Sequence, residues 1–150
     1  IGSAGSYVER LQVRDVVVAE YAFSNSTYAL NTSGCTDKQI LPDPKLNNII
    51  SEKAKEIGIE CKLAKVHSSD AFYTDPALGT WQDIRDKSGT ECVEMEGFAL
   101  FHNAHLTGKH AACILTISDA FYNQVALTAE ERQNTFTQMM TLALESAIAM

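Results

Sequence analysis

The sequence predicts a single α/β domain over residues 1–150, in which a mixed, largely parallel sheet is covered by helices. Two observations predict this class. Short runs rich in β-branched residues alternate with segments of helical periodicity, and several of these runs are apolar enough to be buried on both faces of a sheet. With 150 residues, of which 45% are hydrophobic, the chain can bury one core.

The first half of the chain predicts two strands with a helix between them. Residues 11–23 are rich in valine and aromatic side chains and predict a strand, which a polar loop follows. Asp43 is the predicted N-cap and Pro44 the first residue of a helix that ends at Gly58, because apolar residues recur at helical spacing in between. Residues 59–66 then predict a second strand.

The second half continues the alternation. Predicted strands cover residues 90–95 and 110–118, and predicted helices cover residues 80–89, 97–108 and a long terminal segment from Leu127. The terminal helix opens with Thr128 and Glu131, which form a capping box. The predicted buried stripe of this helix consists of Phe136, Met139, Met140, Ala143, Leu144, Ala147 and Ile148. Arg132 lies four residues before Phe136 and continues this stripe. Its guanidinium either pairs with a carboxylate, of which Asp119 is the nearest candidate, or covers apolar neighbours at the surface.

The net negative charge of the chain argues against nucleic acid and anionic membranes as partners. The net charge is −7 and the pI is about 5.0, whereas nucleic acid and anionic membranes require clustered Lys and Arg. No run reaches the roughly 20 apolar residues that span a bilayer. The four cysteines are widely spaced without a metal-binding pattern, so we expect reduced thiols, a cytoplasmic location and no bound metal.

Polar residues follow three of the predicted strands, at the ends where α/β proteins bind their ligands. They are the segment from His67 to Tyr73, the pair Met95 and Glu96, and the pair Ser118 and Asp119. Each segment alone also fits a solvated loop. Because all three lie at strand ends, together they favour a shared pocket.

Four segments carry a resemblance to a known family. They are IGSAG at the start of the chain, VEMEG after Cys92, TISD at residues 116–119 and TAEERQNTFTQMMTLALESA from Thr128. With these segments the chain resembles the bacterial-type, hexameric purine nucleoside phosphorylases of the nucleoside phosphorylase superfamily. The resemblance implies the fold of that superfamily. It also implies a natural N-terminal portion ahead of Ile1, where the family carries an arginine.

The resemblance implies a nucleoside site. The counterpart of Glu96 binds the ribose hydroxyls, that of Met95 packs against the sugar, and that of Glu94 lines the same site, although Glu94 can equally be a structural acid. An ionised carboxylate accepts hydrogen bonds from vicinal hydroxyls and stabilises a ribosyl group that becomes cationic. Ser118 matches a residue beside the base. Phe72 matches an aromatic residue that packs against the base, and plain core packing is the alternative for it.

The resemblance also implies the reacting groups. Asp119 matches the general acid that protonates N7 of the purine as the glycosidic bond breaks, and Arg132 matches the arginine that assists this proton transfer. Gly2 and Ser3 match the phosphate-binding turn, in which backbone amides and the serine hydroxyl hold the anion. Ala120 stands where the family often has histidine, so the base preference or the loop closure differs from that pattern.

The resemblance therefore implies an enzyme that phosphorolyses purine nucleosides or 2′-deoxynucleosides to the free base and the pentose 1-phosphate, with phosphate as a co-substrate and no cofactor. The alternatives are a nucleosidase or uridine phosphorylase of the same superfamily, and a non-catalytic nucleoside-binding or storage protein. Uridine phosphorylases lack an acid at the place of Asp119, and a binding protein is expected to have lost Asp119 or Arg132. The resemblance further implies a homo-oligomer, a hexamer built as a trimer of dimers, with pockets shared between subunits.

Overall fold

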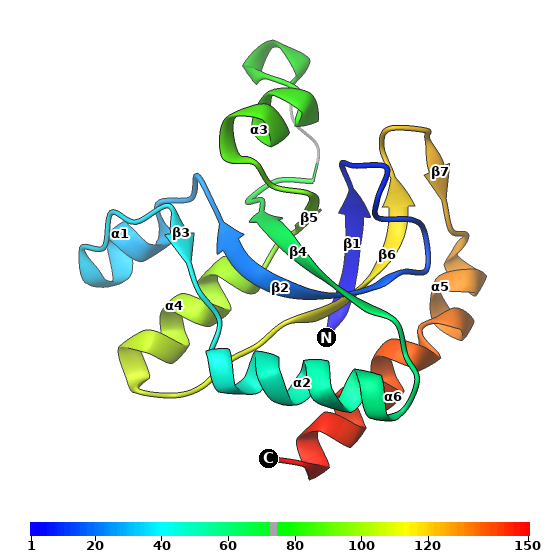
Figure 1. The fold of residues 1–150 in the computed structure, drawn as a ribbon. Helices are drawn as coiled ribbons and strands as arrows, with labels where there is room; N and C mark the ends of the chain where they lie inside the picture. Colours follow the sequence, from blue (N-terminus) through cyan, green and yellow to red (C-terminus); the bar gives the residue numbers. More distant parts are fainter. Residues whose placement is uncertain (73–74) are drawn as a thin grey trace.

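The structure is a computed structural model of the chain and describes residues 1–72 and 75–150. Its strands are β1 (Gly2–Ser6), β2 (Val16–Phe23), β3 (Gln39–Ile40), β4 (Cys61–Ser68), β5 (Cys92–Glu94), β6 (Ile114–Ala120) and β7 (Val125–Ala126). Its helices are α1 (Tyr28–Ser33), α2 (Pro44–Glu56), α3 (Trp81–Ser88), α4 (Gly97–Thr107), α5 (Ala129–Thr135) and α6 (Thr137–Ile148), with a 3₁₀ turn, η1, at Pro76–Leu78. Figure 1 shows these helices arranged around the strands.

The strands form one sheet in the order β3-β2-β4-β5-β1-β6-β7. An additional pairing between β2 and β6 joins the two sides of its central part, so β2, β4, β5, β1 and β6 form a closed ring. The two longest ladders, β2–β4 and β1–β6, are parallel, whereas β1–β5 and β2–β6 are antiparallel. The predicted α/β class with a mixed, largely parallel sheet is confirmed.

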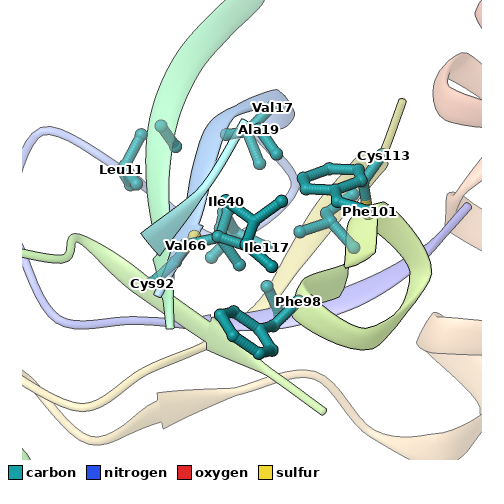
Figure 2. Packing of buried hydrophobic residues seen from close by; sticks show 14 of the residues in the cluster. Leu11, Val17, Ala19, Ile40, Val66, Cys92, Phe98, Phe101, Cys113 and Ile117 are labelled. Atoms are coloured by element: carbon teal, nitrogen blue, oxygen red, sulfur yellow. The ribbon is translucent and has the colours of Figure 1, made fainter. Parts of the chain in front are cut away.

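Two apolar clusters occupy the two faces of the strands. In the first, Phe98 and Phe101 of α4 pack in one cluster with Leu115 of β6, and Figure 2 shows both rings turned toward the strands. In the second, α2 and α6 cover Val18 and Ile114. Ile114 and Leu115 are neighbours that belong to different clusters, as the alternation of side chains along a strand requires. Helices therefore cover both faces, as the sequence predicts.

Four short elements, α1, β1, β3 and β7, lie where the sequence predicts no helix or strand. The strand β1 is the most instructive, because Gly2 and Ser3 match a phosphate-binding turn. This segment contains no β-branched or aromatic residue, so its intrinsic strand propensity is low. Pairing with β6 on one side and with β5 on the other holds it extended. The prediction of a turn in this segment is therefore wrong.

The predicted long terminal helix consists of two helices. Phe136 separates α5 from α6 at φ −86° and ψ 20°. The buried residues at the break and in α6 are Phe136, Met139, Leu142 and Ser146. The prediction that Met140, Leu144 and Ile148 are buried is wrong, because all three are exposed. Because α6 carries apolar side chains around most of its circumference, the sequence period does not single out the buried face.

The helix starts follow the predicted caps. The Asp43 carboxylate accepts hydrogen bonds from the backbone N–H groups of Lys45 at 2.7 Å and Leu46 at 3.0 Å, at the start of α2. Thr128 and Glu131 form the predicted capping box of α5. All four cysteines are free thiols, as predicted. Within the described part of the chain, no helix combines the length and the apolar character that crossing a membrane requires.

Candidate active site

Four neighbouring strands bring one row of residues together. His67 of β4 pairs with Val93 of β5. Val93 in turn pairs with Gly5 of β1, which pairs with Asp119 of β6. Because residues that pair across strands point to the same face, this row runs across one face of the sheet from His67 to Asp119. In Figure 1 the arrowheads of β1, β4 and β6 point toward the end of the molecule that carries α3 and the β6–β7 turn.

A β-bulge decides which residue of β6 enters this row. Ala4 pairs with Ile117, whereas the next residue of β1, Gly5, pairs with Asp119, so Ser118 is skipped. Bulges of this kind redirect a side chain within a strand. Here the bulge brings Asp119 onto the face of Gly5 and leaves Ser118 buried directly beside it.

The Asp119 carboxylate accepts hydrogen bonds from two side chains. The Ser118 hydroxyl donates to Oδ2 at 2.5 Å, and Arg132 Nη2 donates to Oδ1 at 2.8 Å. The side chain of Asp119 is 29% exposed and that of Arg132 is 41% exposed. The predicted pairing of Arg132 with Asp119 is confirmed, and the alternative of a guanidinium that only covers apolar neighbours is wrong.

The start of α5 holds Arg132 in this position. Its Nε donates a hydrogen bond to the backbone carbonyl of Leu127 at 3.1 Å. The preceding residue, Glu131, closes the capping box with Thr128 and forms an ion pair with Arg14, in which Nη2 and Oε1 are 2.8 Å apart. Contacts therefore connect the loop before β2 with the helix that carries the guanidinium.

Glu94 differs from Asp119 because the turn after β5 uses both of its oxygens. Oε2 accepts hydrogen bonds from the backbone N–H groups of Glu96 at 2.8 Å and Gly97 at 2.7 Å. Oε1 accepts a hydrogen bond from the hydroxyl of Ser68. Glu94 is only 8% exposed. These contacts favour the structural alternative for this acid, because a carboxylate at a helix N-terminus caps the helix and complements its dipole.

Met95 and Glu96 project from this turn. Glu96 is the N-cap residue of α4 at φ −129° and ψ −25°, so the strand alternation ends before it. Both residues are exposed, whereas Glu94 is buried. Within residues 1–72 and 75–150, the Glu96 carboxylate has no hydrogen-bond partner. Its oxygens are therefore available to a ligand at the start of α4.

Gly2 and Ser3 lie at the beginning of β1. Both pair with β6 in the parallel ladder, and Ser3 is exposed. Ser3 and Met95 lie at the same end of the antiparallel β1–β5 ladder, each two residues beyond its Gly5–Val93 pair. The Ser3 hydroxyl therefore belongs to the same end of the site as the exposed N-cap of α4, although its backbone forms a strand.

Phe72 lies in the segment that follows β4. It is 75% exposed, which excludes the alternative that it packs in the core. The predicted contact between Phe72 and a base stays a prediction. Tyr73, at the end of the same polar segment, lies outside the described residues.

An aromatic group that the sequence does not predict includes a ring, that of Phe121, which lies against Gly5. Tyr7 and Trp81 stack with ring centroids 5.6 Å apart, and the Phe121 ring lies 5.7 Å from Tyr7 and 6.1 Å from Trp81. The Tyr7 hydroxyl also lies 3.1 Å from Nδ1 of His67. These rings come from the ends of β1 and β6, the start of α3 and the end of β4. Because only the tertiary fold brings them together, no local sequence pattern indicates the group.

Burial shifts the pKa of the two polar members of this group, Tyr7 and His67. Desolvation raises the pKa of Tyr7 well above its usual value, and the nearby Cys92 raises it further. Desolvation lowers the pKa of His67, an effect that Asp70 opposes. Both side chains are therefore neutral near pH 7. Since the buried Tyr7 hydroxyl has no other acceptor among the described residues, we infer that it donates to Nδ1 of His67 and that the imidazole proton lies on Nε2.

Two hollows in the surface lie away from this row. One of about 100 Å³ lies beside α2 and α4, and one of about 310 Å³ lies between α2 and α6. Neither is lined by Asp119, Glu96 or Ser3. Among the residues that the structure describes, no group of three or more His, Cys, Asp or Glu could hold a metal ion.

Comparison with known sequences identifies the family. The model of the phosphorylase superfamily matches residues 1–150. A DeoD-type purine nucleoside phosphorylase from Shewanella denitrificans is 33% identical over all of this chain and 63% of its own length. One from Streptococcus pneumoniae serotype 19F is 38% identical over 99% of this chain and 63% of its own length. The chain thus spans 63% of the length of these curated relatives.

Solved structures share the fold at lower sequence identity. Purine nucleoside phosphorylase from Toxoplasma gondii in complex with immucillin-H matches with a TM-score of 0.83 and 19% identity, over 97% of this chain and 60% of its own. The 5′-methylthioadenosine/S-adenosyl homocysteine nucleosidase of Campylobacter jejuni matches with a TM-score of 0.83 and 21% identity, over 99% of this chain and 67% of its own. A futalosine hydrolase mutant from Helicobacter pylori matches with a TM-score of 0.79 and 21% identity, over 99% of this chain and 66% of its own. Since the family model covers every residue of a chain that folds in this way, the chain belongs to the phosphorylase superfamily.

Proposed function

We propose that the chain carries the reacting groups of a purine nucleoside phosphorylase, which transfers the pentosyl group of a purine nucleoside or 2′-deoxynucleoside to phosphate. One observation carries the proposal: the Asp119 carboxylate, held by Ser118 and Arg132, lies in register with Gly5 on the neighbouring strand β1. The names of the curated relatives support the same reaction.

In the proposed reaction Asp119 donates its proton to N7 of the purine while the bond between C1′ and N9 breaks. The base then leaves as a neutral molecule that keeps the bonding electron pair, which lowers the barrier to its departure. A phosphate oxygen forms the new bond to C1′. Asp119 becomes a carboxylate, and the Arg132 guanidinium and the Ser118 hydroxyl stabilise that charge.

The sugar subsite of the proposal consists of Met95, Glu96 and Ser3. The exposed Glu96 carboxylate accepts hydrogen bonds from the ribose hydroxyls and stabilises the positive charge that develops on the sugar. Met95, which is 41% exposed, offers apolar contact to the ribose. Glu94 contributes by holding the turn that presents both residues. Ser3, with Gly2, lies where phosphate approaches the same sugar.

Glu96→Ala tests the sugar subsite. We expect a higher KM for the nucleoside and a lower kcat, because the acceptor for the ribose hydroxyls and its negative charge are both lost. Glu52→Ala is the matched control, since Glu52 is an exposed glutamate of α2 outside the site. Equal kinetics for the two variants would remove Glu96 from the site.

Hydrolysis by water is the second candidate, because the superfamily fold is shared with enzymes that use water. Two of the structural neighbours are hydrolases by name, the nucleosidase and the futalosine hydrolase.

The proposal includes assembly and location. We propose a homo-oligomer, a hexamer arranged as a trimer of dimers with pockets shared between subunits, and the exposed apolar side chains Leu144 and Ile148 of α6 support association. We also propose a cytoplasmic location, which the four free thiols support. Sedimentation of the full chain tests the first point, because a monomer with full activity would contradict it.

Phosphate dependence separates the two candidate reactions. The full chain is incubated with inosine, adenosine or uridine, with and without phosphate, and the sugar product is identified. Phosphorolysis predicts that purine nucleosides are cleaved only with phosphate and give the pentose 1-phosphate. Cleavage at the same rate without phosphate, with free pentose as the product, would instead establish the hydrolase. Uridine cleavage at the purine rate would contradict the purine assignment.

A further inference from the structure

The Phe121 ring lies directly on the backbone of Gly5. A Cβ built on Gly5 would be 2.5 Å from Cε2 of this ring, a distance at which two carbon atoms overlap. Gly5 is the residue in register with Asp119 on one side and with Val93 on the other. The ring therefore fills the place in the middle of the row where a side chain is missing.

Two aromatic rings, those of Trp81 and Tyr7, lie beside Phe121 in this place. The Trp81 ring is close to parallel with it, at an interplanar angle of 28° and a centroid distance of 6.1 Å, and the Tyr7 ring lies 5.7 Å away. The Arg85 guanidinium lies 5.3 Å from the centroid of the Trp81 ring and fixes that ring further. The slot over Gly5 is thus built for a flat aromatic group, and Phe121 is its present occupant.

This slot coincides with the place that a base must take under the proposed function, on which the inference rests. Neighbouring strands lie about 4.8 Å apart, so the row from His67 to Asp119 spans about 14 Å between Cα atoms. A base that presents an acceptor nitrogen to Asp119 and lies along the row must cover Gly5. The Phe121 ring and the base therefore compete for one position.

We propose that Phe121 is a displaceable internal occupant of the base subsite, and that Tyr7 and Trp81 form the wall on which a planar base stacks once the Phe121 ring has left. The backbone N–H of Phe121 donates to the carbonyl of Ser6 at 2.9 Å. Rotation of the side chain about χ1 moves the ring without breaking this bond. The residue is already 40% exposed, so the ring has a path toward solvent.

This competition predicts how the affinity for a base changes when the Phe121 ring is removed. An aromatic pair stabilises its partners by an amount that corresponds to roughly two- to tenfold in an equilibrium constant, and a ligand that must first displace such a contact binds weaker by that factor. Removing the Phe121 ring should therefore strengthen the binding of a base. If Phe121 were itself the stacking partner of the base, its removal would weaken binding.

The test measures binding of a free purine base, hypoxanthine, to the full chain. Trp81 is the chain's only tryptophan, so its fluorescence reports on the slot without a label. We expect hypoxanthine to bind Phe121→Ala roughly two- to tenfold more tightly than the unmodified chain. Val125→Ala is the control, because Val125 is the first residue of β7, directly after the turn that begins at Phe121, and carries no ring. It should leave the affinity unchanged.

A second variant tests the wall. Trp81→Leu, measured by calorimetry, should weaken hypoxanthine binding, since the stacking surface is lost while the backbone of α3 is kept. Unchanged or weaker binding by Phe121→Ala, an equal gain in Val125→Ala, or unchanged binding by Trp81→Leu would each overturn the inference. Base binding requires no turnover. A chain that binds hypoxanthine in this pattern but cleaves no nucleoside would therefore refute the proposed function and support the slot.

Discussion

The buried carboxylate of Glu94 and the partly buried carboxylate of Asp119 differ in where their hydrogen-bond donors come from. Glu94 and Asp119 each accept a hydrogen bond from a serine, Ser68 and Ser118 respectively. The other donors to Glu94 are backbone amides two and three residues further along the same turn. The other donor to Asp119 is a guanidinium on a separate helix. A carboxylate held by its own turn stabilises local structure, whereas one held across elements is free to exchange partners when a ligand binds.

Glu94 and Asp119 also differ in how far solvent or a ligand can reach them. Glu94 is 8% exposed, and its two oxygens are saturated by three donors, so a ligand would have to break existing bonds to reach it. The Asp119 side chain is 29% exposed and belongs to the row through Gly5. We conclude that the first acid positions the α4 turn and that the second is the proposed acid of the reaction.

The largest expected effect is that of Asp119→Asn on turnover. General acid catalysis contributes about 10²- to 10⁴-fold in rate, and the amide keeps the shape but has no proton to give. We therefore expect kcat for a purine nucleoside to fall by that factor, with the free energy of unfolding changed little. Glu94→Gln is the matched variant and should lower kcat far less. Equal losses of kcat in the two variants would contradict the assignment of different roles to Asp119 and Glu94.

Arg132→Gln should have the next largest effect. The variant removes the charge that stabilises Asp119 after proton transfer, and a hydrogen bond to a charged group is worth about 1.5–3 kcal/mol, or roughly 10- to 100-fold in rate. Arg14→Gln serves as the control, because Arg14 forms an exposed ion pair with Glu131, which lies beside Arg132 on α5. Steady-state kinetics should show a large loss of kcat for the first variant and a small one for the second.

Glu94→Gln should lower stability instead. The new amide NH₂ faces backbone or hydroxyl donors, and a buried donor without an acceptor costs about 1–3 kcal/mol. Urea denaturation of the variant should show this loss in the free energy of unfolding, whereas Asp119→Asn should show little change. An unchanged unfolding curve for Glu94→Gln would mean that its bonds to Glu96 and Gly97 do not hold the turn.

The two serines provide the smallest and most closely matched test. Ser68 donates to Glu94 and accepts from the backbone N–H of Phe98 at 2.8 Å, so Ser68→Ala should cost about 1 kcal/mol or more of unfolding free energy. Ser118→Ala should leave stability nearly unchanged and lower kcat a few-fold, because it removes one of the two donors to Asp119. A reversal of this pattern would contradict the assignment of roles.

Much of the fold follows from local sequence signals. The helix α2 has an aspartate cap, a first-turn proline and regular apolar spacing, and the strand β6 is apolar on both faces, so each is recognisable alone. In contrast, β1 is made of small residues and is extended only because two other strands pair with it. The break at Phe136 follows no cap or proline in the sequence, and nothing in the structure explains it.

Some features of the candidate site can also be predicted from the sequence, whereas others depend on the tertiary fold. The ion pair between Arg132 and Asp119 is predictable, because helix phase and the polar end of a strand indicate both partners. The role of Glu94 depends on how tightly the turn closes after β5, which the strand period cannot give. The slot over Gly5 depends on strand register, on a bulge and on rings from three distant segments, so the sequence offers no sign of it.

The most direct test of the account compares two substrates in one variant. A purine nucleoside methylated at N7 already carries the positive charge that protonation supplies, so its base leaves without a general acid. The ratio of kcat for a natural purine nucleoside to kcat for its 7-methylated analogue is measured in the unmodified chain and in Asp119→Asn. We expect the ratio to fall by about 10²- to 10⁴-fold in the variant, because only the natural substrate needs the proton. A ratio that stays the same, with both substrates slowed equally or neither slowed, would contradict the role of Asp119 as the acid.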